Sequence, residues 1–164
     1  MVLITSNEVI DLAFSSVEQI TPGIIKETKI EAAQERYIRP AFGEMYDAMT
    51  EGRYPEFVNT YLKPALAYFV RHDVIPEVST PIGNTGAMLP YANHANAATD
   101  KQRELAMDSA LNSANALLGK AIRHIEAHRE DFPEYKPLVK CPSIRGGMIF
   151  KTWQRVIISI RERP

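Results

Sequence analysis

The chain has 164 residues, of which 45% are hydrophobic and 24% charged, and its formal net charge is −1. This length suits a single domain with its own core, and the single cysteine, Cys141, excludes an internal disulfide. The apolar runs are far shorter than the ~20 residues of a membrane span, and the N-terminal residues lack a signal-peptide pattern, so we expect a reducing cytoplasm and no membrane insertion.

The first third of the chain carries the signals of two helix starts. A short helix is expected from about Asn7 to Phe14, with Thr5 or Ser6 as its N-cap. Thr21 and a proline at the next position have the order of an N-cap and a first-turn residue. This order predicts a second helix from Pro22 to about Arg39.

Pro40 is expected to interrupt this second helix. It lacks a backbone donor and disfavours a helical residue before it, so two short helices should meet there at a fixed elbow. We expect a third helix from Ala41 to Met49, restarted past Gly43, with Gly52 just beyond its end.

A fourth helical stretch is expected to begin at Pro55 and to run to Val74. Pro64 should kink or divide it, and Pro76 should end it. The residues from Ser79 to Ala98 then form a predicted long central loop, which is longer than compact domains usually keep without a purpose. Such a loop is either a partner-binding or assembly element or a disordered segment.

The strongest helix signal runs from Asp100 to about Asp131. Thr99 and Gln102 stand at the spacing of a capping box, and small and aliphatic residues recur at helical spacing behind them. The members of this stripe are Met107, Ala110, Leu111, Ala114, Leu117, Leu118, Ala121, Ile122 and Ile125. Its alanines would let a neighbouring helix come close.

The last part of the chain differs in both pattern and charge. Gly146 and Gly147 suggest a tight turn and residues 156–160 are rich in β-branched side chains, which predicts a small C-terminal β hairpin or strand. Seven basic residues against the single acidic residue Glu162 give residues 136–164 a charge of +6, so residues 1–135 carry −7. The fold class expected is therefore mainly α, a helical bundle at residues 1–135 followed by a basic strand or tail segment at residues 136–164.

The sequence carries only weak signals for metal binding or catalysis. His124 and His128 are four residues apart and could share a metal ion, but the glutamate that follows the first histidine in metalloproteases is absent, so an exposed polar face is favoured. Nothing near His72 or Asp73 in sequence orients them around Cys141. The spacing of Tyr54, Tyr61, Tyr68 and Phe69 favours helix packing. We therefore expect no enzyme activity and no cofactor.

Five short motifs nevertheless resemble a known family. They match, in order, the small helical head–tail connector proteins of tailed phages, in versions found in phages and prophages of gut Bacteroidetes, including crAss-like phages. The resemblance covers about residues 3–132. The motifs are Leu3-Ile4-Thr5, Ile20-Thr21-Pro22, Ala33-Gln34-Glu35-Arg36-Tyr37-Ile38, Phe42-Gly43-Glu44-Met45-Tyr46-Asp47 and Leu62-Lys63-Pro64-Ala65-Leu66-Ala67.

The resemblance implies a structural virion protein at the neck of the particle, made in the host cytoplasm. It implies a homo-oligomeric adaptor ring, usually twelvefold, that docks on the portal protein, links the capsid to other neck or tail proteins and surrounds the DNA channel. The basic end would then meet the acidic face of the next subunit or contact genomic DNA through phosphates without reading sequence. The residues expected to make these contacts are Arg145, Lys151, Arg155, Arg161 and Arg163.

The alternative is a bacterial helical regulatory or partner-binding protein without a virion role. A helix-turn-helix reader of DNA should carry Arg, Asn and Gln on the helix that follows its turn. The residues from Ala41 to Tyr46 are acidic and apolar instead, which weakens that reading.

Overall fold

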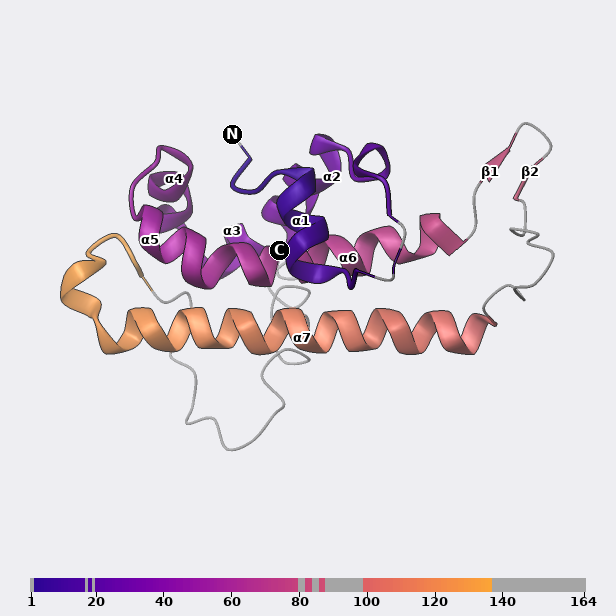
Figure 1. Ribbon diagram of the computed structural model, residues 1–164. Helices are drawn as coiled ribbons and strands as arrows, with labels where there is room; N and C mark the ends of the chain where they lie inside the picture. Colours follow the sequence, from indigo (N-terminus) through magenta and orange to yellow (C-terminus); the bar gives the residue numbers. More distant parts are fainter. Residues whose placement is uncertain are drawn as a thin grey trace, which may run out of the picture.

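The computed structural model describes residues 2–16, 18, 20–79, 82–83, 86–87 and 99–136. Over these ranges the protein is mainly helical, as predicted, and its helices share one hydrophobic core (Figure 1). The β element expected near residues 144–160 lies outside the described residues.

The elements follow one another with short connections up to residue 79. They are α1 (Ser6–Ala13), a 3₁₀ turn (Pro22–Ile24), α2 (Glu27–Ala33), a π turn (Gln34–Ile38), α3 (Arg39–Phe42), α4 (Glu44–Thr50), α5 (Pro55–Phe57), a second π turn (Val58–Leu62), α6 (Lys63–Ser79), β1 (Ile82–Gly83), β2 (Gly86–Ala87), α7 (Asp100–Ala127) and a 3₁₀ turn (Arg129–Asp131).

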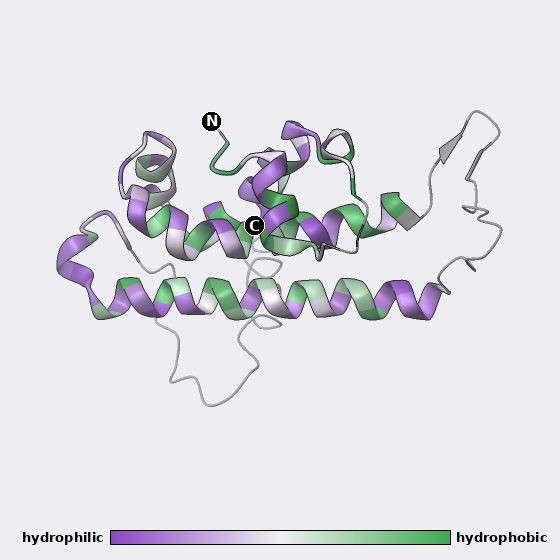
Figure 2. Cartoon of the chain, viewed as in Figure 1, coloured by the Kyte–Doolittle hydropathy of each residue, from purple (hydrophilic) through white to green (hydrophobic). Residues whose placement is uncertain are grey.

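Helix α6 is the centre of the body. It lies between α7 on one side and the layer that contains α1 and α2 on the other (Figure 1). Leu66 and Val70 of α6 and Ile125 of α7 are fully buried in the shared core. Apolar and polar residues recur along α7, which gives it one face that packs on α6 and one that is exposed (Figure 2).

The predicted stripe of α7 is confirmed at its centre. Ala110, Ala114, Leu118, Ala121 and Ile125 are buried, because the short alanine side chains let α6 pack closely. The flanking members of the stripe are only partly buried, namely Met107, Leu111, Leu117 and Ile122.

The predicted N-caps of α1 and α7 are confirmed, as Thr5 and Thr99, and each belongs to a capping box. In α1 the Glu8 backbone N–H donates to Thr5 Oγ1 at 3.3 Å, and the Thr5 N–H donates to a Glu8 carboxylate oxygen at 2.8 Å. Thr99 and Gln102 make the same pair of bonds at α7. Helix α7 ends at Ala127, before the expected end near Asp131, because the chain tightens into a 3₁₀ turn.

The helix expected from Pro22 to Arg39 begins later than predicted. Pro22 opens only a 3₁₀ turn, and the Thr21 side chain makes no capping bond there. The turn stops at Ile25, whose carbonyl oxygen accepts a hydrogen bond from Ser6 Oγ at 2.7 Å instead of a helical N–H. Helix α2 then starts at Glu27.

The prediction that the helix breaks at Pro40 was wrong in position. The chain stays helical from α2 through the first π turn into α3, and Pro40 lies inside α3. In the π turn the Arg39 N–H bonds to the Gln34 carbonyl, five residues back, and this wider turn accommodates the proline ring. The break comes at Gly43, with φ 55° and ψ −125°, a backbone geometry that favours glycine.

The same arrangement occurs before Pro64. The Lys63 N–H bonds to the Val58 carbonyl across the second π turn, and the helix continues beyond the proline. The predicted end at Pro76 was also wrong, because α6 continues past it to Ser79. Val74, two residues before this proline, is fully buried, so core packing outweighs the one hydrogen bond that proline cannot make.

The predicted loop from Ser79 to Ala98 is described in part. Strands β1 and β2 pair in antiparallel fashion, with Ile82 opposite Ala87, a feature that sequence analysis did not predict. The other residues of residues 80–98 lie outside the described ranges.

Candidate interaction site at the end of the long helix

The five basic residues predicted to contact a neighbouring subunit or DNA lie outside the described residues, and so does Cys141. They are Arg145, Lys151, Arg155, Arg161 and Arg163. Their roles stay predictions. The described part of the chain instead offers an aromatic cleft at the C-terminal end of α7.

His124 and His128 lie side by side at this end, with ring centroids 4.5 Å apart. His128 Nδ1 lies 2.9 Å from the His124 carbonyl oxygen, to which it can donate. No group of three or more metal-ligating side chains occurs in the described ranges. His124 is stacked on Tyr61 at 4.3 Å, so its ring serves as an aromatic surface.

The opposite wall is built where α5 begins. Tyr54, with φ 59°, is the only non-glycine residue of positive φ in the described part of the chain, and Pro55 starts the helix directly after it. This turn places the rings of Tyr54 and Phe57 at 5.1 and 5.3 Å from that of Phe132. A left-handed residue costs free energy and persists only where its surroundings hold it.

Glu134 supplies that support. The Tyr54 hydroxyl donates to its carboxylate, which also pairs with Arg53 Nη1 at 2.5 Å. The hydrogen bond from Tyr54 lowers the pKa of Glu134, and the same bond raises the pKa of Tyr54. The ionised carboxylate therefore fixes the strained turn to the segment that follows α7.

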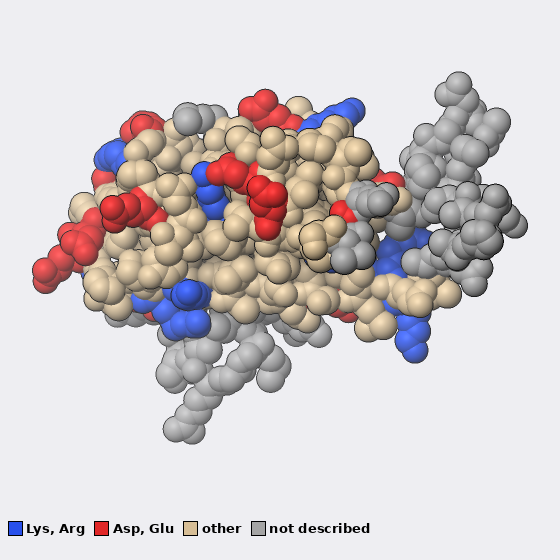
Figure 3. Space-filling view, viewed as in Figure 1, with Lys and Arg blue, Asp and Glu red and all other residues tan. Residues whose placement is uncertain are grey.

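Together these elements enclose an open cleft of about 690 Å³. Its lining residues are Tyr54, Pro55, Glu56, Phe57, Thr60, Tyr61, His124, Asp131 and Phe132. Glu56 and Asp131 are exposed, and neither has an ion-pair partner among the described residues. Figure 3 shows acidic side chains gathered at this end of the molecule, where α5 and the turn after α7 lie. Aromatic faces beside free carboxylates favour a cationic group.

A second polar cluster surrounds Asp73 of α6. Its carboxylate accepts from the Tyr37 hydroxyl at 2.9 Å and from Arg36 Nη1 at 3.1 Å, and it lies 3.0 Å from His72 Nδ1. Burial raises the pKa of Tyr37, which also stacks on Phe69 at 4.2 Å. These contacts join α6 to the first π turn and leave Asp73 fully engaged.

A small cavity of about 250 Å³ lies next to this cluster. Lys29 and Glu77, which line it, form an ion pair with each other. The cavity therefore has its own charges neutralised, unlike the aromatic cleft.

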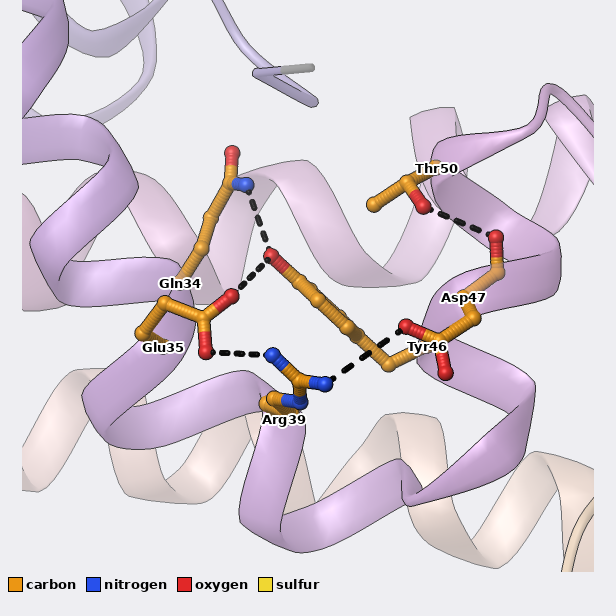
Figure 4. A network of polar contacts seen from close by, with 6 residues as sticks. All are labelled: Gln34, Glu35, Arg39, Tyr46, Asp47 and Thr50. Atoms are coloured by element: carbon orange, nitrogen blue, oxygen red, sulfur yellow. Dashed lines mark hydrogen bonds and ion pairs between the residues drawn. The ribbon is translucent and has the colours of Figure 1, made fainter.

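A third network joins the first π turn and α3 to α4 (Figure 4). Gln34 is the one buried polar residue among those described; its Oε1 accepts from the Leu3 N–H at 2.7 Å and its Nε2 donates to Tyr46 at 3.1 Å. The Tyr46 hydroxyl donates to Glu35 at 3.3 Å, and Glu35 pairs with Arg39 at 2.9 Å. Burial raises the pKa of Tyr46.

Over the described residues, fold and contacts define a helical protein in which ion pairs join one helix to another and an aromatic cleft lies at the end of α7. Residues 22–144 match the model of a family of unknown function (DUF6712), and the chain belongs to this family. No curated protein and no solved structure matches the chain. Among the described helices, none has the length and apolar character needed to cross a membrane.

Sequence analysis missed the cleft. It assigned Tyr54 and Tyr61 to helix packing and treated the two histidines as a polar face. The available signal was that Phe57 and Tyr61, and likewise His124 and His128, are four residues apart and so share a helix face. Only the packing of α7 against the second π turn brings the two pairs together.

Proposed function

We propose that this chain is a structural subunit of a tailed phage, a head–tail connector that forms a ring on the portal protein and links the capsid to neck or tail proteins around the DNA channel. Its place would be the neck of the virion. The support is the resemblance of residues 3–132 to connectors, considered together with the positions of the matching motifs in the fold.

Those motifs lie at the joints of the helical body, and this is the observation that carries the proposal. Leu3 binds Gln34 through its backbone N–H, and both residues belong to matching motifs. Gly43, which separates α3 from α4, belongs to a third motif, and Pro64 after the second π turn belongs to another. A likeness concentrated at helix joints is what we expect of a protein whose function is its shape.

The charge distribution supports assembly from like subunits. Residues 1–135 carry −7 and residues 136–164 carry +6. Opposite charges on the two parts attract copies in head-to-tail order, and a head-to-tail contact closes into a ring when the rotation between copies allows it. In the ring, the five predicted basic residues would meet the acidic face of the neighbour or the phosphates of the DNA.

The test is the mass of the native assembly, measured by light scattering or cryo-electron microscopy for the full chain alone and with portal complexes from its source. A closed ring of about a dozen copies, alone or on the portal, is the expected result. A monomer that ignores portal complexes would overturn the proposal and favour the regulatory or partner-binding alternative.

A further inference from the structure

We propose that the aromatic cleft at the end of α7 binds the basic C-terminal segment, residues 151–164, of a second copy of this chain. This inference rests on the proposed ring and assigns one of its contacts. The cleft would hold an arginine side chain of the segment between its aromatic rings and its two free carboxylates.

The aromatic walls fit a flat cation. Tyr61 and Phe57 are stacked at 5.8 Å, and His124 extends this stack along α7. Lys120 Nζ already lies 5.4 Å from the centre of the Tyr61 ring, so one edge of the cleft attracts a cation within the chain itself. A guanidinium group is planar, stacks on such rings and keeps its charge when it is partly buried.

The carboxylates select for positive charge as well. Glu134 and Glu44, which lie nearby in the fold, are neutralised by Arg53 and Lys136. Glu56 and Asp131 have no ion-pair partner in the described ranges, although both line the cleft. Two carboxylates without an ion pair therefore lie beside the aromatic walls, where they can pair with a guanidinium in a bidentate contact.

The C-terminal segment has the complementary chemistry. Residues 151–164 contain Lys151, Arg155, Arg161 and Arg163 against the single acid Glu162. They also include Trp153 and the apolar residues 156–158, which suit an aromatic-lined cleft. An occupant of this kind brings positive charge for the carboxylates and apolar surface for the aromatic walls.

The path of the chain favours a segment from another copy over the chain's own. After Phe132 the Tyr135 ring packs on Phe42 at 6.3 Å, and Lys136 Nζ pairs with Glu44 at 2.7 Å. These contacts lead the chain onto α3 and α4, and neither helix contributes a lining residue to the cleft. At Lys136 the described chain therefore lies against α4 and outside its own cleft, which favours a neighbour's segment as the occupant.

Trp153 provides the measurement, because it is the only tryptophan of the chain. Its emission wavelength and its quenching by acrylamide would be recorded for the full chain over a dilution series. We expect a blue-shifted, protected tryptophan at high concentration and an exposed one on dilution. The double variant Glu56→Gln, Asp131→Asn should move the midpoint to a concentration at least about tenfold higher.

The matched control is the double variant Glu104→Gln, Asp108→Asn. It removes the same two charges from the exposed start of α7, outside the cleft, and should leave the midpoint unchanged. Thermal unfolding of both double variants checks that the fold is intact. The double variant Arg161→Gln, Arg163→Gln changes the other partner of the contact. It should raise the dilution midpoint as the cleft variant does.

Three results overturn the inference. They are a signal that shifts equally in the cleft and control variants, a signal that shifts in neither, and a cleft-dependent signal that ignores dilution, which would assign the cleft to the chain's own segment. The assembly mass is measured on the same samples. If the free chain is a monomer, the mass is measured on the portal-bound ring instead. A ring whose Trp153 ignores the cleft variant overturns this inference alone, whereas absence of any ring overturns the proposed function.

Discussion

The segments Tyr37–Phe42 and Tyr61–Leu66 have the same order of side chains, a tyrosine, an aliphatic residue, a basic residue, proline, alanine and an apolar residue. Each proline follows a π turn, and each basic residue donates its backbone N–H to a carbonyl five residues back. The chain nevertheless ends its helix soon after the first segment and extends it to Ser79 after the second.

The residue that follows each segment explains the difference. Gly43 follows the first and takes φ 55°, so the helix stops and α4 starts in a new direction. Ala67 follows the second and is fully buried within α6. The proline is thus compatible with a continuing helix once a π turn precedes it, and the glycine decides where the helix ends.

The largest effect is expected from the aliphatic residue of each segment. Ile38 and Leu62 are both fully buried, so replacement of either by alanine should lower the free energy of unfolding by about 2–5 kcal/mol through lost burial and a cavity. Chemical denaturation of the two variants measures this. Costs that differ by more than that range would show that one π turn packs on the core and the other does not.

The second prediction concerns Gly43, where the helix of the first segment ends. Gly43→Ala should destabilise the protein by about 1–3 kcal/mol because a side chain disfavours its backbone geometry, although space for the added Cβ is open. Gly23→Ala is the matched control, since the added Cβ there also meets nothing and φ is ordinary. An equal cost at the two glycines would refute the account of the helix end.

The third prediction separates the prolines from the π turns. Pro40→Ala and Pro64→Ala should each change the free energy of unfolding by less than ~1 kcal/mol, because the π turns already relieve the clash and the loss of chain stiffness offsets a new donor. Equilibrium denaturation by urea is sufficient. Stabilisation by about 3 kcal/mol in either variant would mean that the native helix is strained by its proline.

The successes of sequence analysis came from local signals. The capping pair Thr99 and Gln102 and the alanine stripe act within α7 itself, so the sequence predicts this helix well. The predictions that helices break at Pro40 and Pro76 were wrong. Core packing can outweigh the free-energy cost of a proline in a helix, and the sequence alone does not reveal that packing. The same order of side chains around Pro40 and Pro64 was visible in the sequence and indicated that the two prolines have similar surroundings. The rule that a proline ends a helix does not take such surroundings into account.

The aromatic cleft was beyond reach for a different reason. Its walls come from residues 54–61 and from residues 124–132, and they meet through the long-range packing of α7. The strained turn at Tyr54 depends on Glu134, a partner 80 positions away in the chain. No periodic pattern in one sequence encodes such a pairing, whereas the basic end was visible as a simple count of charges.

The smallest predicted effect compares the basic residues of the two segments. Arg39 pairs with Glu35 on its own helix, whereas Lys63 pairs with Glu8 of α1 at 2.6 Å. The hydrogen bond from Lys63 is the main cause that lowers the pKa of Glu8 below 4.5, with help from the Thr5 N–H. The ionised form of Glu8 therefore stabilises the fold above pH 4.5, and this contribution is lost as the pH falls through the lowered pKa.

Glu8→Gln tests this linkage, because glutamine keeps the capping box and removes only the charge. We expect a loss of less than ~1 kcal/mol at neutral pH, since both side chains are partly exposed and water screens the pair. Urea denaturation of wild type and variant at a series of pH values should show the difference shrinking towards zero in acid. Lys63→Met should show the same trend, and a difference that stays constant in acid would mean that packing, not charge, joins α1 to the second segment.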